Sequence, residues 1–539
     1  MPDAVVIGAG PNGLVAGNVL ADAGWSVVVL EAQPEPGGAV RTEELTRPGF
    51  RHDLFSAFYP LAVASPVLRS MNLDHHGLHW CRAPIALAHP TPDGRCAYVA
   101  GGVDETAASI DSYQPGDGES WRRLYAQWEV VHEPLLGALL STFPPLRHGL
   151  RLATTLGPAG LVRFARFATL PVRRLAEEEF AGAGGGLLLA GNALHGDFSP
   201  EATLGGFFGW LLACLAQQVG FPVPEGGASE LARSLVQRLD ARGGTVECDT
   251  RVSGIVVRKG RARGVTLAGG GDIVATRAVL ADVDAPTLYL DLLEPEHVPS
   301  RVLDDIGRFH WDPSTIKVDW ALDGPVPWEA EPARRAGTVH VSDSMDQLTQ
   351  WSADLAKGLV PAEPFLIFGQ QSLADPTRCP PGTATAWSYT RVPRRTRGDA
   401  GGDLTGAWTP ADLGAFADRM EARVEALAPG FRGLVRGRHV TGPAQMEAAD
   451  SSLRGGAING GTAQLHQQLV FRPTPGMARP ETPVTGLFLA SSSAHPGGGV
   501  HGAPGANAAH AALAAEGWRE LPARAARQAR HLLDRRGVG

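Results

Sequence analysis

Residues 4–31, AVVIGAGPNGLVAGNVLADAGWSVVVLE, decide the fold. Ala4 to Ile7 is a short apolar run rich in β-branched residues, which is typical of a buried strand. The turn Gly8-Ala9-Gly10-Pro11-Asn12-Gly13 follows at once, and Leu14 to Ala23 then predicts a helix. Ser26 to Leu30 predicts a second strand. A strand, glycine turn, helix and strand in this order predict a parallel α/β unit.

Each piece of this unit has a role in binding a dinucleotide. Gly8 permits the tight turn, Gly10 lets the backbone approach a pyrophosphate, and Gly13 lets the helix pack close to the strand. The phosphates then lie at the helix N-terminus, with Pro11 and Asn12 beside them, where free N–H groups favour negative charge. Glu31 directly follows the second strand and is placed to bind ribose hydroxyls. Its charge disfavours the 2′-phosphate of NADP, so NAD and FAD stay open at this point.

A second glycine pattern narrows the choice. Gly37-Gly38-Ala39-Val40-Arg41-Thr42 follows Glu31 closely. This GGxxRT pattern resembles that of the flavoprotein superfamily of amine oxidases, phytoene desaturases and Rab GDP-dissociation inhibitors. The resemblance implies FAD, with Gly37, Gly38, Arg41 and Thr42 supporting its pyrophosphate from a second loop. No Cys or His stands where a covalent flavin linkage could be argued, so we expect FAD to bind non-covalently.

The middle of the chain supplies more of the same domain. Ala228 to Ala241 predicts a helix with leucines on one face. A predicted β-meander follows, with strands at Thr245–Cys248, Val252–Arg258, Arg263–Leu267 and Asp272–Leu280. Its end, Ala278 to Asp282, again has the pattern of a buried strand. The resemblance implies that this block closes the FAD domain, with Val252 touching adenine through its backbone.

The C-terminal part contains a third glycine-rich loop. Gly486 to Ala490 predicts a buried strand, the loop HPGGGVHGAPG follows, and a helix is expected from Ala506 to about Ala515. A glycine loop that opens a helix offers N–H groups to the charge that develops on a reduced flavin. The expected contacts are Ser492, Pro496, Gly497, Gly498, Gly499 and Val500. The loop resembles the signature of phytoene desaturase-like flavoproteins, and the nearest branch resembles pyridine nucleotide-disulphide oxidoreductase domain-containing protein 2.

The expected fold class is α/β: an interrupted Rossmann-type FAD-binding domain plus a mixed α+β substrate-binding domain. We place the FAD-binding domain at residues 1–75, 222–300 and 478–539, the last including a C-terminal helix. Residues 76–221 and 301–477 are assigned to the substrate domain. Within it, Thr315–Leu322, Pro364–Gly369 and Ala384–Val392 predict strands. Thr409-Pro410-Ala411-Asp412 is typical of a helix start.

The candidate catalytic residues are His495, His501 and Lys317. His495 and His501 flank the third glycine loop, and Lys317 lies in a strand whose neighbours Ile316, Val318 and Trp320 point the other way. No nucleophile elbow and no metal-ligand cluster is present in the sequence. We therefore expect a FAD-dependent dehydrogenase or desaturase that transfers hydride from a C–C or C–N bond of an organic, lipophilic small-molecule substrate to flavin N5. A flavin amine oxidase and a non-redox lipid carrier resembling Rab GDP-dissociation inhibitors remain alternatives.

Composition excludes other classes. The formal net charge is −8, with no domain-wide basic excess, which argues against nucleic-acid binding. The five cysteines are far apart and form no CxxC pair, which argues against a disulfide scaffold or zinc ribbon. The start of the chain lacks a signal-peptide pattern, so we expect a cytoplasmic protein. Residues 147–174 mix arginines with large apolar side chains, which leaves peripheral membrane contact open. The sequence does not determine the oligomeric state.

Overall fold

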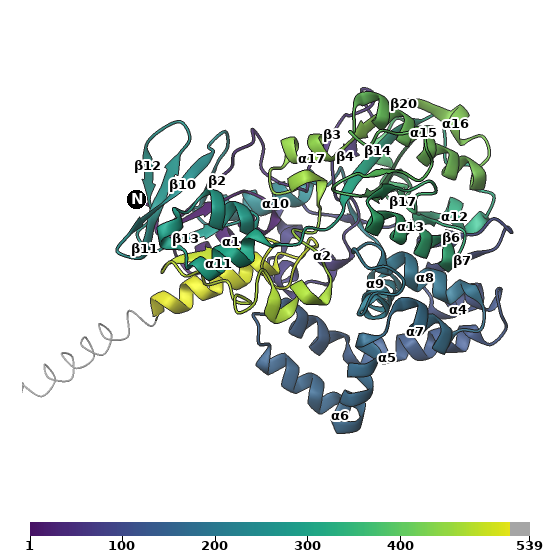
Figure 1. Ribbon diagram of the computed structural model, residues 1–539, viewed down its shortest axis with the longest axis horizontal. Helices are drawn as coiled ribbons and strands as arrows, with labels where there is room; N and C mark the ends of the chain where they lie inside the picture. The colour runs from purple at the N-terminus through teal and green to yellow at the C-terminus, as the bar shows by residue number, and fades with distance from the viewer. Residues whose placement is uncertain (518–539) are drawn as a thin grey trace, which may run out of the picture.

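A computed structural model describes residues 1–517, and two sheets organise it (Figure 1). The first is a five-stranded parallel sheet. In order across the sheet it comprises β21 (Leu487–Leu489), β13 (Ala278–Ala281), β1 (Ala4–Ile7), β2 (Val27–Leu30) and β9 (Thr245–Glu247). Its strands come from the start, middle and end of the chain, so the interrupted α/β fold expected from the sequence is confirmed.

Both faces of the parallel sheet are covered, which explains why its strands are continuous apolar runs. On one face, Val6 and Val29 pack against α1 (Pro11–Asp22), α10 (Ser229–Asp240) and the helix at residues 503–517. On the other, Val5 and Val28 pack against the antiparallel strands β10 (Val252–Arg258), β11 (Arg261–Leu267) and β12 (Asp272–Val274) and against α11 (Ser300–Gly307).

Two details of the predicted meander are wrong. Thr245–Cys248 does not belong to it, because β9 pairs in parallel with β2. Asp272–Leu280 is two elements: β12 ends at Val274, and β13 joins the parallel sheet beside β1. The three-stranded sheet therefore contains only β10, β11 and β12.

The second sheet has seven strands and is mixed, with the β15–β6 pair parallel and the other pairs antiparallel. Its order is β20 (Val435–Thr441), β14 (Ser314–Leu322), β18 (Ala384–Val392), β17 (Leu366–Gly369), β15 (Ala336–Val341), β6 (Ile85–Pro90) and β7 (Cys96–Ala100). The three strands predicted here are confirmed. Segments on both sides of residues 222–300 share this sheet, while the exact domain boundaries stay a prediction.

The two faces of the seven-stranded sheet differ in chemistry. Ile316, Val318 and Trp320 of β14 pack into an apolar core against α15 (Pro410–Leu427) and α16 (Phe431–Leu434). Thr409 caps α15 by accepting a hydrogen bond from the Asp412 N–H at 3.2 Å, as predicted. The opposite face carries polar side chains and is turned toward a layer of helices.

This helical layer lies below the sheet in Figure 1. It comprises α4 (Val103–Asp111), α5 (Asp117–Leu140), α6 (Leu146–Thr169), α7 (Val172–Glu179), α8 (Ala183–Ala193) and α9 (Gly205–Val219). Trp121, Trp128 and Trp210 are fully buried between α5 and α9 and form the centre of this core. Within residues 1–517, no helix has the length and apolar character needed to cross a bilayer.

Further elements complete the described chain. The remaining labelled α-helices are α2 (Pro60–Ala64), α3 (Pro66–Arg69), α12 (Glu331–Arg334), α13 (Met345–Lys357), α14 (Gln371–Ala374) and α17 (Pro443–Ala449). Three two-stranded pairs join β3 (Thr42–Glu43) with β4 (His52–Asp53), β5 (Trp80–Cys81) with β8 (Val223–Pro224), and β16 (Leu359–Val360) with β19 (Gly398–Asp399).

Candidate active site

A cavity of about 510 Å³ joins the two sheets. Gly8, Glu31, Asp282 and Ser491 line it, and each closely follows a strand of the parallel sheet. The cavity therefore lies at the carboxyl edge of that sheet, where open α/β sheets bind ligands.

We name two halves of this cavity by their lining residues. The nucleotide half is lined by Gly8, Gly10, Pro11, Asn12, Glu31, Gly38, Val252, Asp282 and Asp450. The substrate half is lined by Phe58, Leu136, Leu139, Leu140, His195, Phe198, Phe208, Leu211, Leu212, Phe221, Thr315, Lys317, Thr338, Ile367, Trp387 and Tyr389. Ser492, Pro496, Gly498, Gly499, Val500 and His501 also line the cavity.

The first glycine loop is as tight as the sequence predicts. Gly8 has φ +92°, and a Cβ there would stand 2.7 Å from the carbonyl oxygen of Asp282. A Cβ at Gly13 would overlap the carbonyl oxygen of Gly8. Pro11 is the first residue of α1, so the helix N-terminus opens directly onto the cavity. Only glycine allows strand, turn and helix to approach this closely.

Glu31 lies beside this loop and is buried. Its carboxylate accepts hydrogen bonds from the N–H of Ala9 at 2.8 Å and the N–H of Gln33 at 2.9 Å. It therefore fixes the first glycine loop as well as lining the cavity. Each carboxylate oxygen has lone pairs left, which could accept from a ribose hydroxyl.

The second glycine loop packs on the first. The N–H of Gly37 donates to the carbonyl of Ala9 at 2.9 Å, and only Gly38 of the four predicted contacts lines the cavity. Arg41 instead donates to the carbonyl of Ala449 at 2.9 Å, and Thr42 donates to Asp53 at 2.7 Å. In this structure, Gly37, Arg41 and Thr42 do not line the cavity; they bond to the residues around the nucleotide half.

Two carboxyl groups in the nucleotide half were missed by sequence reasoning. Asp282 accepts a hydrogen bond from the Gly13 N–H at 2.7 Å, and burial raises its pKa to about 8. Burial also raises the pKa of Asp450 to about 6. Asp282 directly follows β13, as Glu31 follows β2, so its position at a strand end could have indicated it. Asp450 follows a helix of the substrate segment, and no sequence pattern indicates it.

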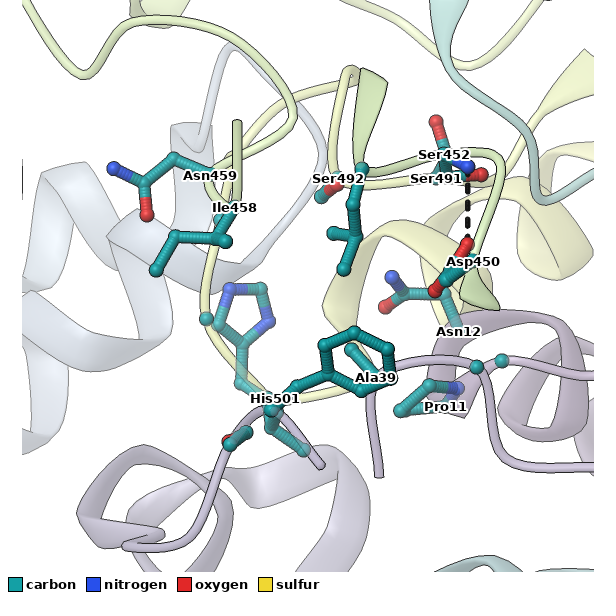
Figure 2. Close-up of a pocket in the computed structure, with 18 of the residues that line it drawn as sticks. Pro11, Asn12, Ala39, Asp450, Ser452, Ile458, Asn459, Ser491, Ser492 and His501 are labelled. Carbon is teal, nitrogen blue, oxygen red and sulfur yellow. Dashed lines mark hydrogen bonds between the residues drawn. The ribbon is translucent and has the colours of Figure 1, made fainter. Parts of the chain in front are cut away.

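The third glycine loop closes the cavity from the C-terminal side (Figure 2). A Cβ at Gly498 would stand 2.8 Å from the carbonyl oxygen of Asn459, so this loop packs directly on residues 458–462. Gly497 supports the turn without lining the cavity. A Cβ at Gly505 would overlap the carbonyl oxygen of Asn12, which brings the C-terminal helix against the start of α1.

The two histidines of this loop lie differently. His501 lines the cavity, and its Nδ1 accepts from the Ala503 N–H at 3.2 Å. His495 does not line the cavity: it is buried edge-on to Phe143 with ring centroids 5.8 Å apart. Burial lowers the pKa of both rings to about 4, so both are neutral near pH 7.

Arg472 organises this region and was not singled out as a site residue. It is fully buried and donates to the carbonyl oxygens of Asn459, Gly460 and Ser492 at 2.9, 3.0 and 2.7 Å. Asp312 accepts from the N–H groups of the same segment, residues 458–461. The buried side chains of Arg472 and Asp312 therefore hold residues 458–461 in place, and the third glycine loop packs on this segment.

Lys317 lines the substrate half from the polar face of the seven-stranded sheet. It pairs with Asp319 two residues on, and its Nζ lies 5.9 Å from the ring centre of Trp387. Strand β14 is interior, between β20 and β18, and Lys317 is only 1% exposed. Its three apolar neighbours do point to the opposite face, as predicted.

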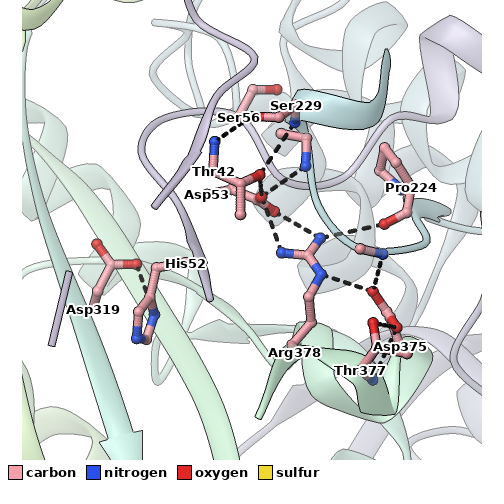
Figure 3. Close-up of polar contacts among 12 residues, drawn as sticks. Thr42, His52, Asp53, Ser56, Pro224, Ser229, Asp319, Asp375, Thr377 and Arg378 are labelled. Atoms are coloured by element: carbon pink, nitrogen blue, oxygen red, sulfur yellow. Dashed lines mark hydrogen bonds and ion pairs between the residues drawn. The ribbon is translucent and has the colours of Figure 1, made fainter. Parts of the chain in front are cut away.

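A buried ion cluster joins parts of the chain that are far apart in the sequence (Figure 3). Arg378 contacts both carboxylate oxygens of Asp53 at 3.0 and 3.1 Å and one of Asp375 at 2.8 Å. Asp53 also accepts from the Ala228 N–H at 2.8 Å, and Asp375 from the Gly226 N–H at 2.7 Å. The cluster thus joins β4, the start of α10 and a loop of the substrate segment.

The residues present fit FAD. The glycine positions leave a cradle that any Cβ would fill, and the cavity runs from Glu31 to the third glycine loop. Asn12 Oδ1 and Asn459 Nδ2, both lining residues, are buried without a partner among the described residues (Figure 2). The raised pKa of Asp282 keeps it largely protonated at neutral pH, which limits repulsion of a pyrophosphate.

Comparison with known proteins agrees with this geometry. The family model of flavin containing amine oxidoreductases matches residues 12–509. The chain is 29% identical to pyridine nucleotide-disulfide oxidoreductase domain-containing protein 2 of Rattus norvegicus, over 94% of this chain and 92% of that protein. It is 26% identical to a lycopene-forming phytoene desaturase of Paracoccus sp., over 93% and 95%. Putrescine oxidase with bound putrescine has the same fold, with a TM-score of 0.60 and 16% identity over 95% and 99% of the chains.

The chain therefore belongs to the flavin containing amine oxidoreductase family. It is a FAD-dependent oxidoreductase of the amine oxidase and desaturase type, and the expected phytoene desaturase-like relationship is confirmed. The individual contacts to FAD stay predictions for each named residue.

Proposed function

We propose that this oxidoreductase dehydrogenates a C–C bond of a neutral, apolar substrate held in the substrate half. One observation carries the proposal: in the part of the chain that the structure describes, no carboxylate lines this half. Its walls are mostly leucine and phenylalanine side chains from α5 and α9 and the segments beside them. The charged side chain that lines it is Lys317, a cation.

This charge pattern disfavours a charged amine. An ammonium group that leaves water needs a carboxylate partner or another compensating contact. The carboxylates that line the cavity, Glu31, Asp282 and Asp450, all lie in the nucleotide half. A neutral substrate avoids this cost, whereas an amine oxidase would have to bind its substrate as the free base.

The proposed chemistry is the removal of two hydrogens from adjacent carbons. Bound FAD supplies the acceptor for hydride at N5, and the second hydrogen leaves the substrate as a proton. The chain's own residues contribute position and exclusion of water: the leucines and phenylalanines shield the reacting bond, and the third glycine loop shapes the wall near the flavin. Lys317 and His501 line the cavity and remain the candidate reacting groups, whereas His495 supports the loop from behind.

Anaerobic mixing tests this proposal. The yellow holoenzyme is mixed with neutral cycloalkenes and cyclic ketones and, in parallel, with cyclohexylamine and putrescine. We expect bleaching of the flavin absorbance by members of the neutral set only. Bleaching by the amines alone would favour the amine oxidase reading, and a protein that bleaches with neither set while still binding apolar probes would favour a carrier.

We also propose that α6 contacts an anionic membrane surface. Leu146 and Leu150 are 78% and 67% exposed before the kink of α6 at Gly157, and Val162 is 72% exposed after it. Arg147 and Arg163 are exposed and directly follow Leu146 and Val162 in the sequence. Exposed leucines flanked by arginines are typical of a helix that lies on a lipid surface.

Vesicle co-sedimentation tests the membrane contact. We expect binding to phosphatidylglycerol-containing vesicles and little binding to phosphatidylcholine alone. Leu150→Ser with Val162→Ser should abolish it, whereas Val274→Ser, which removes an exposed valine from β12, should not. Equal sedimentation of both variants would refute the assignment to α6.

A further inference from the structure

Hydrogen-bonding groups on the wall of the substrate half lack partners. The Nε1 of Trp387 and the Oγ1 of Thr338 are buried without a partner among the described residues. Both residues line the cavity, with exposures of 4% and 1%. They lie on the two strands that flank β17, since Thr338 of β15 pairs with Gly369 of β17 and Gly369 pairs with Trp387 of β18. An indole N–H can only donate, and a hydroxyl can donate or accept.

His195 adds a third group to this wall. Its Nε2 lies 2.9 Å from Nε2 of His340, so one of the two rings donates to the other. Burial lowers the pKa of His195 to about 4 and that of His340 well below its ordinary value, so both rings are neutral. Each ring therefore carries a single N–H, and the hydrogen bond couples the two tautomers.

The surroundings of His340 decide between the tautomers. Its Nδ1 lies against Gly191, at the place a Cβ would take, and has no partner among the described residues. A buried N–H without an acceptor is rarer and costlier than a buried lone pair without a donor. His340 therefore carries its proton on Nε2 and donates to His195. His195 in turn carries its proton on Nδ1, which bonds to no described residue, while the ring lines the cavity.

The charges nearby define the acceptor that these donors await. Lys317 is paired with Asp319, and Arg391, whose Nη2 donates to the His195 carbonyl at 3.4 Å, is paired with Asp312 at 3.0 Å. Each cation close to the wall is thus matched by a carboxylate, and a carboxylate ligand would find no unmatched positive charge. A neutral oxygen can accept from the free N–H groups without that cost.

We propose that the substrate half recognises a neutral acceptor oxygen, a carbonyl or hydroxyl, on an otherwise apolar substrate, with His195 as a donor to that oxygen and His340 as its positioning residue. Trp387 and Thr338 offer further hydrogen bonds along the same wall. This inference rests on the proposed function, because it describes the substrate of that dehydrogenation.

Equilibrium binding to the FAD-loaded protein tests it without turnover. Three probes share one ten-carbon skeleton: limonene has no oxygen, carvone has a ketone, and perillic acid has a carboxylate at neutral pH. The flavin is first reduced with dithionite so that no probe can be oxidised, and binding is followed by the change in tryptophan fluorescence under anaerobic conditions. We expect carvone to bind about tenfold more tightly than limonene and more tightly than perillic acid, as one new hydrogen bond to an otherwise unpaired donor predicts.

Variants assign the donor. His195→Phe should remove the preference for carvone over limonene, and His195→Gln, whose amide also donates, should retain most of it. His340→Leu alone should lower the affinity for carvone. Added to His195→Gln, the same change should lower this affinity little further, because the glutamine amide donates a hydrogen bond without needing His340 to fix a tautomer. A purely structural role for His340 predicts additive losses instead. His310→Phe, an exposed histidine outside the cavity, is the matched control.

The outcomes separate the two proposals. Equal affinities for carvone and limonene, or a carvone preference that survives in His195→Phe, would overturn the inference. Tightest binding of perillic acid would overturn the neutral acceptor. If carvone binds in the expected pattern but no neutral compound bleaches the flavin, the recognition stands and the proposed dehydrogenation fails.

Discussion

Glycines and backbone groups build the nucleotide half of the cavity, whereas large side chains build the substrate half. Gly8, Gly10 and Gly13 fall within six residues, and their close approaches are to neighbouring backbone and to Asp282. The wall of the substrate half combines α5, α9, β14, β15 and β18, which are far apart in the sequence.

The difference shows which half can change. A glycine cradle offers one shape, because an added Cβ at Gly8 or Gly13 meets backbone, and one at Gly10 meets the buried carboxyl group of Asp282. A wall of leucines and phenylalanines can be resized by single substitutions without affecting the nucleotide half. We therefore expect mutations in the two halves to separate FAD retention from substrate handling.

The largest expected effect is at Gly13. In Gly13→Ala, the new Cβ would overlap the Gly8 carbonyl oxygen, so we expect FAD affinity to fall about a hundredfold or more. The FAD-to-protein ratio after purification measures this. Gly149→Ala on α6, where a Cβ would meet nothing within 4 Å, is the control and should keep full FAD content. Normal FAD content in Gly13→Ala would show that the glycine loop has room for a Cβ at position 13, contrary to the structure.

The next effect tests the boundary between the halves. In Gly498→Leu, the side chain must displace the loop at Asn459, while the contacts around Gly8 to Gly13 and Glu31 stay intact. We expect the protein to stay yellow, with a shifted flavin spectrum, a lower reduction potential and about a hundredfold slower turnover. Loss of FAD with an intact fold, or a wild-type potential, would place this loop at the adenosine end.

Glu31 should give a smaller change within the nucleotide half. Glu31→Ala removes a charged acceptor, and such hydrogen bonds contribute about 1.5–3 kcal/mol, so FAD should bind about tenfold more weakly or worse. Part of this loss comes from freeing the Ala9 and Gln33 N–H groups. Titration of apoprotein with FAD measures the affinity, and an unchanged value would count against the ribose assignment.

A pH dependence from Asp282 tests the stability of the fold rather than FAD affinity or turnover. Its pKa is raised from 3.8 to about 8, so the folded protein holds a proton that the unfolded chain releases. The resulting stabilisation is full below pH 3.8 and is lost as the pH rises through about 8. Asp282→Asn should remove this slope, so the melting temperatures of wild type and variant should diverge between pH 5 and pH 8. Parallel curves for the two apoproteins would contradict the assignment.

Features that depend on local sequence were predicted, whereas features that depend on long-range pairing were not. The strand, glycine turn, helix and acid at residues 4–31 were predicted because each signal lies within a few residues of the next. Strands β14, β17 and β18 were predicted from their own apolar patterns. The predicted meander was wrong at β9, because a three-residue strand carries no signal that tells which sheet it joins.

The sequence by itself determined the dinucleotide-binding unit, the need for glycine at its turns and the family, because these depend on local backbone geometry and on short motifs. Only the tertiary structure decided that Asp282 bonds to Gly13, 269 residues away, that Arg41 turns to Ala449, and that His195 meets His340 across 145 residues. Those contacts depend on how distant segments pair and pack. Local sequence patterns do not reveal these contacts, because the partner of a buried side chain is set by the tertiary fold and not by its neighbours in the sequence.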